Sequence, residues 1–150
     1  MNRLLKIAIA LGVVSGFALC LQSEISAGVG YMTQAKVMSE YKGVTLGMKR
    51  DAVKAAMGNP ASSSDTSDDF NLTGDDKMTV RYDNGEVKAI QLVFSDPKNA
   101  PPWNEVVGDA EASEISNGAR AARKIMEAEN FWVSIYQTKD GATTRITISR

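Results

Sequence analysis

Two apolar runs joined by a tight-turn sequence constrain this chain more than any other feature. Residues 77–82 alternate apolar and polar side chains, Asp83-Asn84-Gly85 follows, and residues 86–95 return with apolar side chains on both faces. A period of two is typical of β-strands, and Asn-Gly supplies the positive φ angles that a two-residue hairpin turn requires. The sequence therefore predicts a β-hairpin whose second strand is an inner strand or carries a bulge near Ala89.

A short helix is expected just before this hairpin. Val53 and Met57 recur at helical spacing, and the charged residues around them lie on the opposite face. Gly58 can close the helix in a left-handed conformation, and Pro60 prevents its continuation. The polar residues 61–76 are expected to form a loop between the helix and the hairpin.

The remaining segments suggest a similar arrangement in the second half. Helical spacing predicts helices over residues 32–41 and 111–130, and the proline-containing residues 96–107 are expected to be a connector. Residues 131–138 and 143–150 alternate around a glycine-containing turn, which predicts a second hairpin. The sequence thus predicts an α+β fold, with helices packed on one face of a small antiparallel sheet of about four strands, in the order α-α-β-β-α-β-β.

The first residues have the layout of a secretory signal peptide. A basic start is followed by an uncharged apolar run and a polar segment ending at Ala27. We therefore expect residues 1–27 to be removed, residues 28–150 to form a single domain, and the protein to be periplasmic or secreted. Cys20 follows Leu19, whereas lipoprotein signals place a small residue before the cysteine, so we expect Cys20 to leave with the signal peptide. Membrane association would require lipidation of Cys20.

Composition disfavours several classes of function. The chain contains no histidine, which is the most frequent general base and a common metal ligand. Loss of residues 1–27 changes the net charge from −1 to −2, and no basic stripe indicates a nucleic-acid partner. Asp69 and the residues after it partly match a calcium-binding loop, but Val80 stands where a bidentate glutamate is required. We therefore expect no enzymatic activity, no cofactor and no metal site.

Three aromatic residues are candidates for contact with a partner. Trp132 and Tyr136 are four positions apart on one predicted strand, so they share a face. Trp103 follows two prolines in the connector, where it either plugs the edge of the core or stands exposed as a partner contact. Tryptophan and tyrosine are enriched at binding hot spots. Trp132 and Tyr136 either stack within the fold, with Arg81 or Arg145 nearby, or form an open aromatic platform for a partner. The second alternative predicts a protein-binding surface.

The segment from Val44 to Phe94 resembles the SmpA/OmlA (BamE-like) family. The resemblance is carried by the helix start Leu46-Gly47-Met48-Lys49-Arg50-Asp51-Ala52-Val53, the helix end Met57-Gly58-Asn59-Pro60 and the apolar hairpin that follows. The repeats of the β-lactamase inhibitor protein are similar in the same region. The resemblance implies a cell-envelope protein that binds another protein, with a possible link to outer-membrane assembly or envelope integrity. The alternatives are a periplasmic binder of a small ligand or carbohydrate, or an inhibitor of an envelope or secreted enzyme.

Cleavage of the signal peptide is directly testable. We expect the protein from the envelope fraction to begin at Gly28, because the basic, apolar and polar segments end at Ala27. Intact-mass spectrometry measures the mature chain. A diacylglycerol adduct on Cys20 would contradict this expectation and strengthen the BamE-like interpretation.

Overall fold

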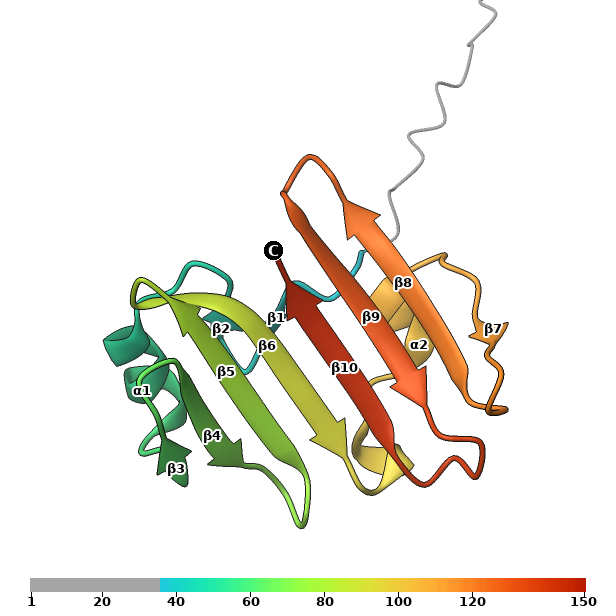
Figure 1. Cartoon of the computed structure of the whole chain (residues 1–150), viewed down its shortest axis with the longest axis horizontal. Helices are drawn as coiled ribbons and strands as arrows, with labels where there is room; N and C mark the ends of the chain where they lie inside the picture. The colour runs from blue at the N-terminus through green and yellow to red at the C-terminus, as the bar shows by residue number, and fades with distance from the viewer. Residues whose placement is uncertain (1–35) are drawn as a thin grey trace, which may run out of the picture. The chain divides into compact units, whose positions relative to one another are not determined.

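The computed structural model describes residues 36–150, which form an eight-stranded antiparallel sheet, a two-stranded ribbon and short helices (Figure 1). The strand order in the large sheet is β3-β4-β5-β6-β10-β9-β8-β7. The elements are β1 (Glu40–Tyr41), β2 (Val44–Thr45), α1 (Arg50–Met57), β3 (Ser62–Ser63), β4 (Ser67–Asn71), β5 (Lys77–Asp83), β6 (Glu86–Phe94), the 3-10 helix η1 (Pro97–Asn99), α2 (Trp103–Val107), β7 (Ser113–Glu114), β8 (Arg120–Met126), β9 (Phe131–Gln137) and β10 (Thr144–Ser149).

The predicted α+β fold with the order α-α-β-β-α-β-β is wrong. Strands account for 43% of the structure and helices for 14%, so the fold is mostly β. Of the helix expected over residues 32–41, the first four residues lie outside the described part of the chain. Residues 36–39 have no regular structure, and Glu40–Tyr41 is strand β1.

The helix expected over residues 111–130 is replaced by strands β7 and β8. Alanine-rich sequence favours a helix locally, but all seven residues of β8 pair with β9. The segment also contains two residues with positive φ, Gly118 at 78° and Asn130 at 53°. Tertiary pairing therefore overrides the local preference of this segment.

The polar loop expected over residues 61–76 contains strands β3 and β4. β4 pairs with β5 along its full length, from Ser67 opposite Arg81 to Asn71 opposite Lys77. It places Phe70 and the carboxylate of Asp68 in the protein interior. A buried aspartate breaks the apolar–polar alternation by which a strand is recognised, so the pattern resembled a loop.

The local predictions around residues 49–60 and the two hairpins are confirmed. Helix α1 ends at Gly58, which has a φ of 83°. The β5–β6 turn has positive φ at Asn84 and Gly85, and a bulge shifts the register between Arg81 and Tyr82. Strand β6 is also an inner strand, because it pairs with both β5 and β10.

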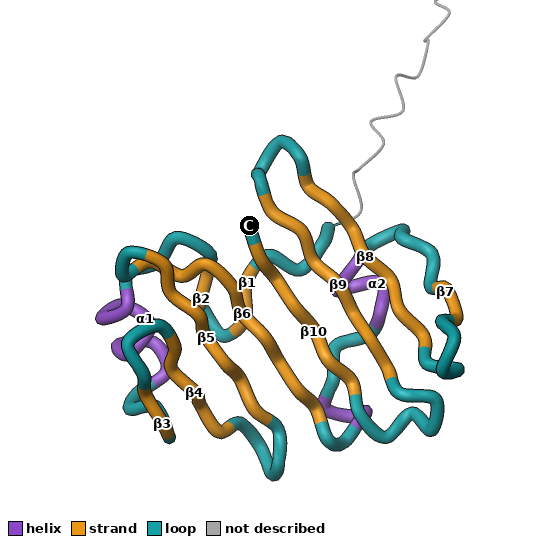
Figure 2. The backbone as a smooth tube through the Cα atoms, viewed as in Figure 1, coloured by secondary structure: helices purple, strands orange, loops and turns teal. Residues whose placement is uncertain are grey.

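The two halves of residues 36–150 share one order of elements. In each half a helix, α1 or α2, precedes four strands that pair as consecutive neighbours, β3 to β6 and β7 to β10. The halves meet where β6 pairs with β10, from Thr144 opposite Phe94 to Ser149 opposite Ala89 (Figure 2). The sequence suggested one repeat of a helix and a hairpin, and the structural unit is a helix followed by four strands.

One face of the large sheet carries the core. Ile90 and Leu92 of β6 and Ile146 of β10 are 0% exposed. Residues 37–48 run behind these central strands, from α2 to the start of α1. The Met38 amide donates to the Val106 carbonyl of α2, and the ring centroids of Tyr41 and Phe94 lie 6.3 Å apart in an edge-on arrangement. No helix within residues 36–150 combines the length and apolar character needed to cross a membrane.

A buried carboxylate ties α1 to the β4 end of the sheet. The Asp68 side chain is 0% exposed and accepts hydrogen bonds from Arg50 Nε and from the Tyr82 hydroxyl, each at 3.0 Å. The Ser63 hydroxyl donates a further bond. Burial acts to raise the pKa of Asp68, but the bonds from Arg50, Ser63 and Tyr82 outweigh it and hold the pKa at about 2, below the ordinary 3.8.

We expect acid to weaken the fold through Asp68. Because its pKa is lower in the folded state, its contribution to stability is complete above about pH 4 and is lost as the pH falls through about 2. The lost contribution is about 2 kcal/mol. Urea unfolding between about pH 2 and pH 7 measures it, and Asp68→Asn should remove this part of the pH dependence.

At neutral pH, Asp68→Asn should lower the free energy of unfolding by about 3 kcal/mol, because Arg50 loses a buried partner. The control is Glu86→Gln, which removes the exposed ion pair with Lys49 and should leave the urea midpoint almost unchanged. Equal midpoints for Asp68→Asn and the unmodified protein would contradict the prediction.

Candidate functional site

The two faces of the eight-stranded sheet are covered very differently. One face is buried beneath α1, α2 and residues 37–48, whereas Figure 1 shows no described helix or strand over the other. The strand register defines this second face, which we call the outer face. Its positions, none of which is buried, are Ser62, Ser67, Asp69, Asn71, Lys77, Thr79, Arg81, Asp83, Glu86, Ala89, Gln91, Val93, Ser113, Ala121, Arg123, Ile125, Trp132, Ser134, Tyr136, Arg145, Thr147 and Ser149.

Two of the three predicted contact residues lie on the outer face. Trp132 and Tyr136 project from β9 and are half-buried, as expected for rings that lie against their cross-strand neighbours. Trp132 stands opposite Ile125, and Tyr136 stands opposite Arg145. The two rings therefore belong to one continuous surface.

Trp103 lies apart from the other two rings. It begins α2, packs against the buried core, and has the guanidinium carbon of Arg120 at 5.3 Å from its ring centroid. Helix α2 contacts β8 and β9 on the covered side of the sheet. Trp103 is thus placed at the edge of the core, which was one of the two interpretations that the sequence left open.

Arg123 joins the two rings on the outer face, although the sequence did not mark it as a candidate. Its guanidinium carbon lies 4.2 Å from the centroid of the Trp132 ring, a favourable cation–π distance. Within the helix expected over residues 111–130, Arg123 would have no fixed relation to β9. A period-two interpretation of residues 120–126, which alternates Arg123 and Ile125 with Ala122, was the available signal.

The outer face carries charges of both signs, and its cations are concentrated differently from its carboxylates. Its cations are Lys77, Arg81, Arg123 and Arg145, and none of them takes part in an ion pair within residues 36–150. Its carboxylates are Asp69, Asp83 and Glu86, all on β4 to β6, whereas its positions on β8, β9 and β10 include Arg123 and Arg145 and no carboxylate. A cationic surface of this kind attracts acidic partners and weakens in salt.

Asp69 is held by its neighbours on the sheet. The Thr79 hydroxyl donates to one carboxylate oxygen at 2.7 Å and the Ser62 hydroxyl to the other at 2.8 Å, and these bonds lower its pKa. Asp69 and Asn71 are residues of strand β4, so the partial calcium motif forms one side of a hairpin. The described residues contain no group of three or more acidic or sulfur side chains placed to hold a metal ion.

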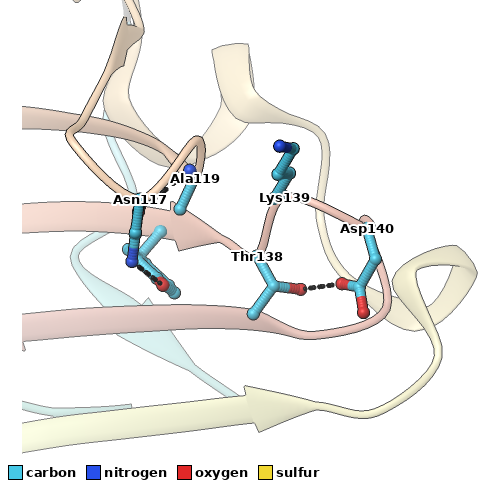
Figure 3. Close-up of a pocket in the computed structure, with 6 residues that line it drawn as sticks. Asn117, Ala119, Thr138, Lys139 and Asp140 are labelled. Carbon is cyan, nitrogen blue, oxygen red and sulfur yellow. Dashed lines mark hydrogen bonds between the residues drawn. The ribbon is translucent and has the colours of Figure 1, made fainter.

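Two open hollows adjoin the outer face. One, of about 550 Å³, lies at the end of β9 beside Tyr136 and is bordered by Asn117 and Lys139 (Figure 3). The Asn117 amide donates to the Tyr136 hydroxyl at 3.5 Å. The other, of about 460 Å³, lies over β5 between Asp69 and Arg81. Both are broad and open to solvent, which suits a protein contact better than the enclosure of a small ligand.

Comparison of the chain with protein-family models, with curated proteins and with solved structures gives no match. The resemblance to BamE-like proteins therefore rests on the motif between Val44 and Phe94.

Replacement of the outer-face rings should leave the fold intact. We expect Trp132→Ala and Tyr136→Ala to lower the free energy of unfolding by less than half as much as Ile135→Ala, which should lose about 3 kcal/mol. Ile135 is the control because it lies between the two rings on the same strand but is 1% exposed on the covered face. Urea unfolding measures the three values. A loss at Trp132 equal to that at Ile135 would assign the ring to the core.

Proposed function

We propose that this chain is an exported protein-binding module of the cell envelope, and that the outer face of its sheet binds an acidic surface of a partner protein. The observation that carries the proposal is the contrast between the faces. One face buries the apolar core, while the other presents the Arg123–Trp132 stack among cations that have no ion-pair partner within residues 36–150.

The side chains of the outer face suit a protein contact. Tryptophan, tyrosine and arginine dominate binding energy at protein interfaces. Trp132 and Tyr136 project from the inner strand β9, which holds their backbone between β8 and β10. The stack also orders Arg123 before binding. A side chain that is already ordered loses less conformational entropy on binding, so more of its contact energy contributes to affinity.

Charge indicates the chemistry of the partner. On strands β8, β9 and β10 the outer face carries Arg123 and Arg145 and no carboxylate. Its carboxylates lie on β4 to β6, where Thr79 and Ser62 donate to Asp69 and Lys49 pairs with Glu86. An acidic partner surface placed over these three strands would gain attraction at both arginines and meet no carboxylate. Such complementarity speeds association and excludes basic partners.

The groups available in this chain favour binding over catalysis. The chain has no histidine, and the strongly buried Asp68 is fully engaged with Arg50, Ser63 and Tyr82. A general acid or base needs a free position beside the substrate and a pKa near the working pH, whereas the pKa of Asp68 is about 2.

A small-ligand function is the second candidate. The hollow beside Tyr136 has a volume comparable to ligand pockets and combines the Lys139 ammonium, the Asp140 carboxylate and the Asn117 amide. These donors and acceptors suit a hydroxylated ligand. Because this hollow is wide open to solvent, we rank a small ligand below a protein partner.

Site-directed photocrosslinking in cells that produce the protein tests the proposal. A benzophenone amino acid at Thr147, in the middle of the outer face, should form an adduct with an acidic protein. The same group at Ala55, which is exposed on α1, is the control and should not form this adduct.

A charge reversal then tests the chemistry. Arg145→Glu should reduce the Thr147 adduct about fivefold, because it places a like charge against the acidic partner. Lys54→Glu makes the same change of net charge on α1 and should leave the adduct unchanged. An adduct that forms only from Ala55, or one from Thr147 that is insensitive to Arg145→Glu, would refute the proposed face.

A further inference from the structure

The outer edge of strand β8 is paired over only part of its length. Strand β8 has seven residues, but β7 pairs with only two of them, Arg120 and Ala121. Figure 2 shows β7 beside one end of β8. Within residues 36–150, no strand pairs with the outer edge of residues 122–126. We call this stretch the free edge of β8.

The direction of the backbone groups along the free edge follows from neighbouring bonds. The Ala119 carbonyl accepts from the Ile115 amide at 2.9 Å, and the Ala121 carbonyl accepts from the Ser113 hydroxyl at 3.4 Å. Backbone groups of alternate residues in an antiparallel strand point to the same side. Arg123 and Ile125 therefore direct their N–H and C=O groups away from β9, and no backbone or side-chain group of the described chain bonds to them.

Charge argues against a second copy of this chain as the occupant of the free edge. Strand β8 carries Arg120, Arg123 and Lys124. Two copies paired edge to edge would place these cations beside one another, and like charges on paired strands are destabilising. The same cations favour an acidic strand.

We propose that the free edge of β8 binds an extended acidic segment of the partner protein by strand addition, an inference that rests on the function proposed above. Main-chain bonds to Arg123 and Ile125 would supply the affinity, and the side chains on the outer face would supply the specificity. The added strand would extend the outer face beside Trp132.

The side chains of the free edge predict a pattern in that segment. Ile125 is 59% exposed and stands next to Trp132, so the residue opposite it should be apolar. The residue opposite Arg123 should be acidic. Between them, the residue opposite Lys124 faces the covered side, where the Lys124 ammonium already pairs with Asp109 at 2.7 Å, and it should be polar and uncharged. In an antiparallel strand this pattern is apolar, polar, acidic.

The test uses the full chain, labelled with nitrogen-15, and the peptide acetyl-Ser-Thr-Val-Thr-Glu-amide. At saturation, hydrogen exchange of the Arg123 and Ile125 amides should slow about tenfold, because both gain main-chain acceptors. Methylation of the valine nitrogen removes a donor aimed at Ile125 and should weaken binding about tenfold or more. Methylation of the second threonine nitrogen is the matched control, since that nitrogen points away from β8.

A pair of variants tests the edge from the side of the protein. Ile125→Pro removes a donor that makes no bond to β9, so the fold should persist while peptide binding falls about tenfold or more. Ile125→Thr keeps the donor and should bind within about threefold of the unmodified chain.

Three outcomes would overturn strand addition. They are the absence of peptide binding, equal binding of the valine-methylated peptide, and binding without protection of the Arg123 and Ile125 amides. If any of them occurs while the Thr147 adduct persists, the outer face binds its partner without strand addition. Loss of the Thr147 adduct instead refutes the proposed function itself.

Discussion

The pairing of β6 with β10 is the constraint on which the rest of the structure depends. Six residue pairs join two four-stranded halves into one sheet, and Ile90 faces Ile148 in the middle of the protein interior. Without this pairing, each half would expose a long apolar strand edge. The pairing also sets which face is buried, because alternation along β6 and β10 must send the isoleucines of both halves to one side. Residues 37–48 then cross the junction on that side, and the outer face is left to polar, cationic and aromatic side chains.

The edges of the sheet show how differently its two ends are stabilised. At the β4 end, Arg50 reaches from α1 to the buried carboxylate of Asp68, and β3 pairs with β4. This end is tied to the core by a buried ion pair whose disruption costs several kcal/mol. At the β8 end, the Lys124–Asp109 ion pair is more exposed. Strand β7 spans two residues, as β3 does, but β8 is longer than β4, so residues 122–126 are left without a partner strand on that side within residues 36–150. The proposed contact surface thus lies at the end of the sheet where β8 has an unpaired edge, while the opposite face of β8 and β9 packs against the core.

Elements that depend on residues close together in the sequence were predicted correctly, and elements that depend on distant strands were not. Helix α1 and both hairpins depend on spacing and turn residues within a few positions, so their existence could be predicted. Strands β4 and β8 could not, because Asp68 and the alanines of residues 119–122 favour a loop and a helix when considered alone. Their strand conformation is imposed by β5 and β9, which supply the main-chain partners. Because these strands were missed, the sequence predicted a sheet of about four strands in an α+β fold, whereas the structure has an eight-stranded sheet and is mostly β.

By itself, the sequence determined that Trp132 and Tyr136 share a face, because side chains of a strand alternate whatever its neighbours are. It also determined the absence of histidine and the near balance of charge in this chain. Only the tertiary structure decided that Arg123 stacks on Trp132, that Trp103 belongs to the covered side, and that Arg123 and Arg145 share the outer face. Each of these depends on which strands become neighbours and in what register. Register is set by apolar burial summed over the whole sheet, a quantity that no single segment contains.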